Sequence, residues 1–95
     1  MIKSKHVNYK GKVFGRVQGV GFRYFVCKKA RGLNLYGWVR NRLDGKVEAL
    51  AEGELSAIKE WALAVRQGPS GSRVEGCELV WKPYTHSFNA FEVVL

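Results

Sequence analysis

The spacing of the hydrophobic residues changes at a glycine-rich stretch early in the chain, and this change limits the folds that the sequence can adopt. From Val7 to Val17, apolar residues and glycines alternate with other residues, a period that is typical of a β-strand. From Phe22 onward the apolar residues recur at helical intervals, which predicts a helix ending at Gly32 or Leu33. The chain therefore begins with a strand and a helix joined by a loop rich in glycine.

The same two spacings alternate through the rest of the chain. The predicted ranges are Leu35–Arg42 and Lys46–Glu52 for two strands joined by a turn at Leu43-Asp44-Gly45, Leu55 to about Gln67 for a second helix, 68–72 for a loop, Arg73–Pro83 for a fourth strand, 84–89 for another loop and Ala90–Leu95 for a closing strand. Gly53 is predicted to end the third strand. This order predicts one α+β domain over residues 1–95, a ferredoxin-like (βαββαβ) two-layer sandwich. Its antiparallel sheet carries two helices on one face and a short extra C-terminal strand.

The glycines between the first strand and the first helix indicate an anion-binding loop. Gly19 and Gly21 leave neighbouring main-chain N–H groups uncovered by side chains, and such a loop can curl around an anion. The following helix adds the positive end of its dipole, and Arg23 in its first turn adds a cationic fork of donors. The alternative is that the glycines only form a tight turn. For Gly15, which is still in the strand, close packing is the favoured explanation.

The predicted topology brings a second polar residue to this loop. A right-handed helical crossover between parallel strands places the ends of the first and second strands at the same end of the sheet. Asn41, where the second strand closes, can therefore approach Arg23 and the glycine loop. From the residues alone, Asn41 can equally cap or turn the hairpin with its own side chain.

The charge of the chain is unevenly distributed, and this favours anionic ligands. The net charge is +8, and the first 46 residues hold twelve Lys and Arg against one acid, Asp44. Such a field steers anions toward the glycine loop. The start of the chain is basic, no signal-peptide apolar segment follows it, and no apolar run is long enough for a membrane span. We therefore expect a cytoplasmic protein without a membrane partner, and its compactness and basic charge favour a monomer.

The sequence shows none of the usual catalytic sets near the loop. It holds no carboxylate pair or Ser-His-Asp set there, and the Lys-Ser/Thr pair of a Walker loop is missing after Gly21. His6 lies at the start of the chain and His86 in a late predicted loop, so neither is favoured as a catalytic residue. Cys27 and Cys77 lack zinc-ligand spacing, so we expect neither a metal nor a cofactor, and we expect both thiols to be reduced, although a disulfide stays open. What remains is positioning and electrostatics, which suits phosphoryl transfer from a mixed anhydride with a good leaving group.

Four segments resemble the acylphosphatase family, in the right order and spacing over nearly the whole chain. They are Gly15–Arg23 (GRVQGVGFR), Leu35–Asn41 (LYGWVRN), Asp44–Glu48 (DGKVE) and Gly68-Pro69. The resemblance implies a ferredoxin-like fold and metal-free hydrolysis of the carboxyl–phosphate bond of small acyl phosphates to a carboxylate and inorganic phosphate. We expect inorganic phosphate, the product, to inhibit competitively. Two positions depart from the family pattern. Asn34 stands where Gly is frequent, and asparagine is the next best residue for a left-handed cap after the helix. Ser72 stands where Ala is frequent, a change that a loop should tolerate.

The resemblance also implies roles for individual residues. Arg23 is expected to bind the phosphoryl group together with the loop amides of Gln18, Gly19, Val20, Gly21 and Phe22. Asn41 is expected to orient the attacking water, and the phosphate itself helps to take the proton of that water. In this interpretation Gln18 and Val20 act through their amides, so their side chains say little.

Two other functions are compatible with the same fold. A nucleic-acid-binding module would use Tyr36 and Trp38 for base stacking among Arg31, Arg40 and Arg42. The predicted third strand, however, holds no aromatic residue, so nucleic acid is the less favoured partner. A catalytically silent interaction domain is the third possibility. Release of phosphate from an acyl phosphate distinguishes the enzyme from both.

Overall fold

The computed structural model describes residues 5–95, and its elements follow the predicted order. They are β1 (His6–Arg16), α1 (Phe22–Gly32), β2 (Tyr36–Asn41), β3 (Val47–Glu54), α2 (Leu55–Gln67), β4 (Arg73–Lys82) and β5 (Phe91–Val93). Both helices have the predicted bounds, and the ends of the strands differ from the predicted ones by one or two residues. The first four residues of the chain, where no signal-peptide segment is expected, lie outside the described range.

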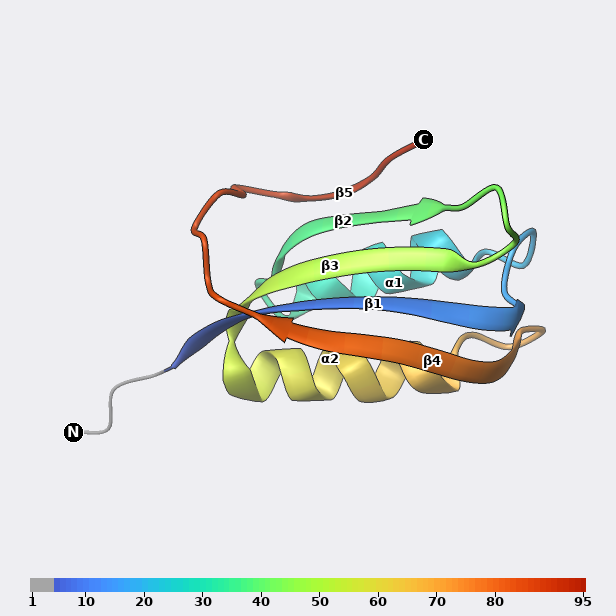
Figure 1. The fold of residues 1–95 in the computed structure, drawn as a ribbon, viewed down its shortest axis with the longest axis horizontal. Coiled ribbons are helices and arrows are strands. Elements are labelled where there is room, and N and C mark those ends of the chain that lie inside the picture. Colours follow the sequence, from blue (N-terminus) through green and yellow to red (C-terminus); the bar gives the residue numbers. More distant parts are fainter. Residues whose placement is uncertain (1–4) are drawn as a thin grey trace.

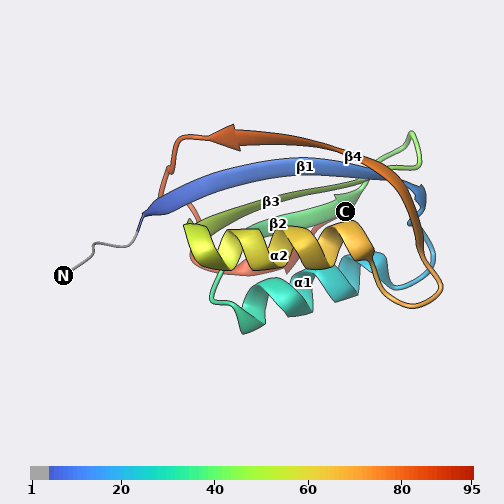
Figure 2. The same cartoon turned by 90° about the horizontal axis from the view of Figure 1, so that it is seen from below.

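The elements form two layers, a five-stranded sheet and a pair of helices that cover one of its faces (Figures 1 and 2). The strand order is β4-β1-β3-β2-β5, so the predicted α+β ferredoxin-like fold is confirmed. The sheet is mixed, because β5 pairs parallel to β2 while the other neighbours are antiparallel. The strands β1 to β4 form the predicted antiparallel sheet, and the short extra C-terminal strand, whose direction was not predicted, joins it in parallel. The segment after β4 crosses the end of the sheet to the far edge, where β5 starts beside the first half of β2.

The hydrophobic core lies between the sheet and the helices. Alternate residues of the strands point into it, among them Val13 of β1, Val39 of β2 and Ala51 of β3. From α2, Trp61 packs edge-on against Phe91 with ring centroids 6.1 Å apart. Each large apolar side chain buried in this way contributes about 1.5–3 kcal/mol to the hydrophobic stabilisation. The core thus joins α2 to the closing strand at the edge of the sheet.

The prediction that Gly53 ends the third strand is wrong. β3 continues through Gly53, which pairs with Val7 of β1, and ends at Glu54 immediately before α2. A Cβ atom on Gly53 would lie 2.5 Å from Cδ2 of Leu35, so the glycine permits close packing inside the strand. Sheet pairing and this close approach override the local tendency of glycine to interrupt a strand.

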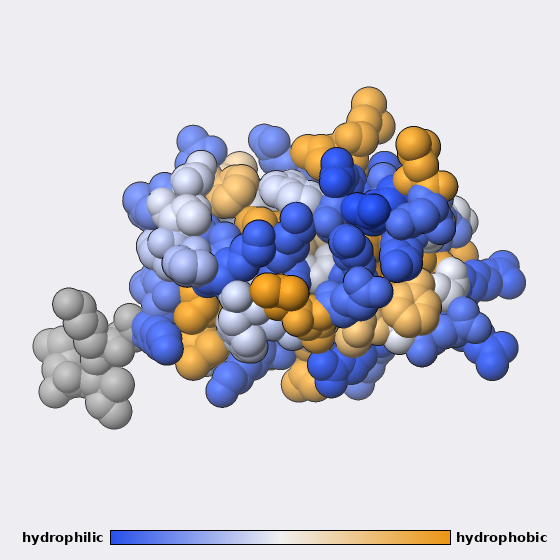
Figure 3. Space-filling model, viewed as in Figure 1, coloured by the Kyte–Doolittle hydropathy of each residue, from blue (hydrophilic) through white to orange (hydrophobic). Residues whose placement is uncertain are grey.

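The face of the sheet opposite the helices carries two buried glutamates. Lys10, Arg40 and Arg42 surround Glu48, with N···O distances of 3.5, 2.6 and 3.5 Å. Burial alone would raise the pKa of Glu48, but the hydrogen bond from Arg40 and the neighbouring positive charges hold this pKa below its usual value. Figure 3 shows this open face, over which hydrophilic residues predominate. The cations here neutralise an internal acid rather than forming a purely positive surface.

Glu52, the second buried glutamate, fixes the segment that crosses from β4 to β5. Its Oε2 accepts hydrogen bonds from Asn8 Nδ2 at 2.8 Å and from the main-chain N and the Oγ1 of Thr85 at 2.7 and 2.6 Å. Burial would raise the pKa of Glu52, but these hydrogen bonds hold it below its usual value. The crossing segment is therefore attached to the middle of the sheet.

Candidate active site

The loop between β1 and α1 requires glycine because of its backbone conformation. Gly19 and Gly21 have φ angles of 76° and 74°, and Val20 between them has a negative φ. A Cβ atom built on either glycine would meet no other atom within 4 Å, so the glycines do not serve close packing. Left-handed residues in a loop of this kind can turn successive N–H groups toward a common point and so form an anion-binding concavity.

Gly15 differs from the two loop glycines. It lies where the pairing of β1 with β4 shifts register between Phe14 and Gly15. A Cβ atom on Gly15 would collide with the main-chain oxygen of Arg73 in β4. The prediction that Gly15 serves close packing is therefore confirmed.

The main-chain donors of the loop are uncovered over an unbroken run. Val17 N donates to Gly15 O at 3.1 Å, and the next donor along the chain is Phe25 N, which donates to Gly21 O at 3.0 Å. Between them, the N–H groups of residues 18–24 find no acceptor among the described residues. The first turn of α1 has neither a side-chain cap nor an acidic residue. This end of the helix therefore presents unsatisfied donors and the positive end of its dipole.

The side chains of the loop separate into two groups. Phe22 is buried in the core and Val20 packs against it, whereas Gly19 and Gly21 are exposed. Arg23 is half-buried in the first turn of α1, and all ion pairs of residues 5–95 involve other side chains. The loop is thus anchored by its apolar residues, and the charge of Arg23 is uncompensated.

Asn41 lies at the same end of the sheet as the loop, as predicted. Val47, the first residue of β3, pairs with Val13 on one side and with Asn41 on the other, so β1 and β2 finish at the same end of the sheet (Figure 1). Asn41 shares the face of Val39, whose side chain is fully buried under the helices. The Oδ1 atom of Asn41 is also buried and has no hydrogen-bond partner among the described residues. A buried amide oxygen without a partner costs about 1–3 kcal/mol, and such atoms are found where a ligand or water completes a site.

The side chain of Gln18 makes a contact that the sequence did not indicate. Its Nε2 atom donates to Arg42 O at 2.8 Å and to Lys46 O at 3.0 Å, on the turn between β2 and β3. Sequence reasoning had given Gln18 a role through its main-chain amide only. No local pattern could have found this contact, because it joins segments more than twenty residues apart.

The family of the chain follows from comparison with known proteins. The model of the acylphosphatase family matches residues 9–93. The chain belongs to the acylphosphatase family. A protein named acylphosphatase from Syntrophotalea carbinolica is 48% identical to it over 89 residues, which are 94% of this chain and 97% of that protein.

Two solved structures of acylphosphatases share the fold. The crystal structure of acylphosphatase from Bacillus subtilis superposes with a TM-score of 0.90 at 42% identity, covering 94% of this chain and 99% of that one. The structure of an acylphosphatase from Coxiella burnetii gives a TM-score of 0.90 at 32% identity and covers 99% and 100% of the two chains. The resemblance predicted from the sequence is thereby confirmed.

The two departures from the acylphosphatase pattern lie outside the candidate site. Asn34, two residues after the end of α1, has a φ of 56°, which confirms the left-handed conformation expected of a residue that replaces glycine there. Ser72 lies in the loop after α2, and its Oγ donates to Pro69 O at 2.6 Å. Both residues serve local loop structure.

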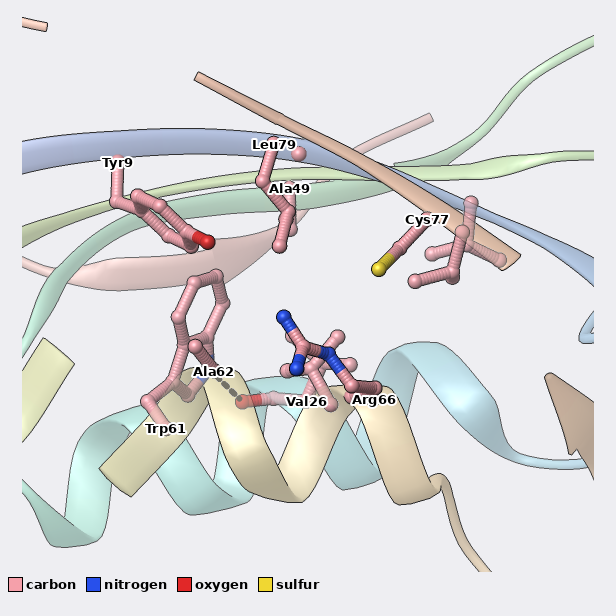
Figure 4. A pocket seen from close by; sticks show the side chains of 12 residues that line it. Tyr9, Val26, Ala49, Trp61, Ala62, Arg66, Cys77 and Leu79 are labelled. Atoms are coloured by element: carbon pink, nitrogen blue, oxygen red, sulfur yellow. Dashed lines mark hydrogen bonds between the residues drawn. The ribbon is translucent and has the colours of Figure 1, made fainter. Parts of the chain in front are cut away.

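The cavity in Figure 4 is separate from the loop between β1 and α1. It lies between α2 and the sheet, has a volume of about 20 Å³, and is lined mainly by apolar side chains such as Leu79. Arg66 points from α2 toward the sheet in this view, and the dashed line marks the bond from Trp61 Nε1 to Val26 O, 3.2 Å long. A space of this size admits about one water molecule, so it is no site for an acyl phosphate.

The other titratable candidates do not join the site. His6, at the start of β1, and His86, in the segment after β4, both lie near Tyr84 at the opposite end of the sheet. Cys27 and Cys77 are free thiols, so the open question of a disulfide is answered for this structure. Among residues 5–95, no group of His, Cys, Asp or Glu is arranged to hold a metal ion, and neither helix is long and apolar enough to cross a membrane.

The contacts of the basic residues do not favour the nucleic-acid alternative. Lys10 Nζ and Arg40 Cζ lie 6.0 and 5.4 Å from the ring centroid of Trp38, and both side chains also pair with Glu48. Arg31, which the alternative placed beside this aromatic, belongs to α1 and donates instead to Phe91 O at 3.0 Å. The basic residues around Trp38 are therefore engaged within the protein, and this alternative is not favoured.

Proposed function

We propose that this chain is an acylphosphatase that hydrolyses the carboxyl–phosphate bond of small acyl phosphates without a metal ion or cofactor. The observation that carries the proposal is the unbroken run of uncovered N–H groups at residues 18–24, beside the unpaired charge of Arg23. Membership of the acylphosphatase family supports the substrate class.

The loop binds the phosphoryl group in this proposal. The amides of Gln18, Gly19, Val20, Gly21 and Phe22 donate to its non-bridging oxygens, and the guanidinium of Arg23 donates from the first turn of α1. Each hydrogen bond to a charged oxygen contributes about 1.5–3 kcal/mol. In a dissociative transition state the charge on these oxygens is what the site stabilises, so the same donors bind substrate and promote its cleavage.

Asn41 holds the attacking water. The water oxygen forms a bond to phosphorus while the bond from phosphorus to the acyl oxygen breaks, and the carboxylate leaves with the electron pair. The proton of the water passes to a phosphoryl oxygen, so a side-chain base is not needed. The unpartnered Oδ1 of Asn41 supports this role, because a hydrogen bond from water would satisfy it after a small movement.

Phosphate release from benzoyl phosphate tests the proposal. We expect the wild-type chain to release phosphate with and without a chelator, and Arg23→Ala to raise KM and to lower kcat sharply. The matched control is Arg16→Ala, which removes an exposed cation at the end of β1. Loss of activity with the chelator contradicts the metal-free reaction, and equal effects of the two arginine variants contradict the specific role of Arg23.

We also propose that residues 1–95 form a single domain and that the protein is a cytoplasmic monomer. One hydrophobic cluster with contributions from every strand and both helices supports the single domain. Two free cysteines fit a reducing compartment, and the net charge of +8 disfavours self-association. Light scattering after gel filtration tests the monomer, since a mass of about twice 10.7 kDa contradicts it.

A further inference from the structure

The side chain of Gln18 connects the loop to the turn between β2 and β3. Its Nε2 donates to Arg42 O and Lys46 O, 2.8 and 3.0 Å away. The same two carbonyls close the neck of the turn, because Lys46 O also accepts from Arg42 N at 2.8 Å and Arg42 O from Gly45 N at 3.2 Å. One side chain of the loop thus holds both strands of the hairpin where the turn begins.

This contact requires a primary amide of this length. The NH₂ group of Gln18 has two hydrogens in one plane, and each is directed to a carbonyl oxygen. A carboxylate in its place would offer no donor and would repel both carbonyls. Asparagine keeps the donors but is shorter by one methylene.

Asn41 lies next to the main chain that the Gln18 side chain holds. β2 pairs with β3 up to Asn41 and Val47, and beyond this pair the bond from Arg42 N to Lys46 O and the two contacts of Gln18 join the segments. Arg42, whose carbonyl Gln18 binds, is the next residue. The Oδ1 of Asn41 has no bond of its own among the described residues. The orientation of Asn41 therefore depends on the main chain that carries it.

The side chain of Asp44 closes the turn with two further hydrogen bonds. Asp44 Oδ1 accepts from Lys46 N at 3.1 Å, and Asp44 Oδ2 from Arg42 Nε at 3.1 Å. The hydrogen bond from Lys46 and that from Arg42 hold the pKa of Asp44 below its usual value, so the carboxylate keeps its charge. Hydrogen bonds therefore join residues 42–46 to one another, and the Gln18 side chain joins them to the loop.

We propose that Gln18 is a positioning residue, whose side chain sets the place of Asn41 relative to the loop amides and Arg23. It acts through the main chain of Arg42 and Lys46 and does not touch the substrate with its side-chain amide. This inference rests on the proposed function, because it assigns a support to the residue that holds the water. The proposal separates two parts of the site. The loop amides and Arg23 form the phosphate cradle, and the contact from the Gln18 side chain to Arg42 and Lys46 forms the clamp that aligns the water.

A double-mutant cycle tests the clamp. Gln18→Met removes both donors and keeps the length of the side chain and the main-chain amide. We expect kcat for benzoyl phosphate to fall about tenfold, which corresponds to the loss of one to two neutral hydrogen bonds. The inhibition constant of inorganic phosphate should stay within about twofold, since the cradle is intact. In an Asn41→Ala background the same substitution should have no further effect on kcat.

The outcomes separate the clamp from the proposed function. If Asn41→Ala is slow and Gln18→Met turns over like the wild type, the clamp alone is rejected. If the two substitutions reduce kcat additively, Gln18 does not act through Asn41 and the inference is overturned. If Asn41→Ala keeps wild-type turnover, the role of Asn41 in the proposed function fails, and the clamp fails with it. Gln18→Asn, which keeps the amide but not the reach, repeats the test if Gln18→Met does not fold.

Discussion

Arg40 donates a hydrogen bond from Nε to Oε1 of Glu48, directly across the β2–β3 pair, over 2.8 Å. The glutamate side chain is only 2% exposed, whereas that of the arginine is 43% exposed. Lys10 and Arg42 complete the surroundings of the carboxylate. The open face of the sheet therefore contains an ionised acid that depends on its cationic neighbours.

Glu48 should contribute to stability at neutral pH and lose this contribution in acid. Because the pKa of Glu48 is lower in the folded than in the unfolded state, its contribution is complete above the unfolded pKa of about 4.3 and disappears as the pH falls through the folded pKa. We expect Glu48→Gln to lower the free energy of unfolding at pH 7 by about 1–3 kcal/mol and to flatten its decline in acid. Denaturant unfolding from pH 7 to 3 measures both effects.

The control for this prediction is Glu78→Gln. Glu78 is 60% exposed and approaches Lys46 at 3.5 Å, so its removal should change stability little. An equal loss of stability in the two variants would show that burial of Glu48 is unimportant.

Asn41→Ala should reduce kcat for benzoyl phosphate by about a hundredfold and leave KM nearly unchanged, because a misplaced water slows the reaction more than it weakens binding. The substitution should also leave stability unchanged or raise it, since the buried, unpartnered Oδ1 is removed. Steady-state kinetics and thermal unfolding check the two parts. Asn89→Ala, in the exposed segment at the opposite end of the sheet, is the control and should behave like the wild type.

Gly21→Ala should weaken phosphate binding through the backbone alone. Gly21 and Gly71 have φ angles of 74° and 89°, and a Cβ atom at either would lie in open space. Alanine at either position should therefore destabilise the fold by a similar amount, about 1–2 kcal/mol. Only the change at Gly21 disturbs the uncovered amides. Inhibition of hydrolysis by phosphate compares the variants, and an equal inhibition constant in both would argue against the cradle.

Inorganic phosphate should shift the amide NMR signals of residues 18–24, and the apparent dissociation constant should rise with salt because the attraction is electrostatic. A single-stranded oligonucleotide should leave Tyr36 and Trp38 unchanged, since Lys10 and Arg40 beside the indole are paired with Glu48. Shifts confined to these two aromatics, with none on adding phosphate, would favour the binding-module alternative. Sulfate, an anion of the same shape, serves as a second probe.

Local spacing predicted those features of the fold that depend on neighbours in sequence. The start of α1 at Phe22 follows from periodicity, and the end of β2 at Asn41 lies one residue before the predicted end at Arg42. The left-handed Asn34 was also predicted correctly, because the conformational preference of asparagine is local. The placement of Asn41 beside the loop followed from topology rules rather than from contacts.

The features that the sequence did not predict depend on distant partners. β3 passes through Gly53 because Val7 and Leu35 meet it from elsewhere in the chain. The parallel pairing of β5 follows from the segment after β4, whose path Glu52 fixes by binding Thr85. The contacts of the Gln18 side chain arise in the same way. In each case the contact joins two segments that are far apart in the sequence, and local periodicity says nothing about such contacts.

The donors of the loop between β1 and α1 belong to peptide groups, and this determines which substitutions the loop can accept. Replacing a side chain at Val20 leaves its N–H in place, whereas proline there would delete the donor itself. The backbone conformation of the loop therefore determines which ion it binds, and most of its side chains have little influence. The side chains of such a loop can vary widely while the loop still binds the same ion, provided that the residues with positive φ keep this conformation.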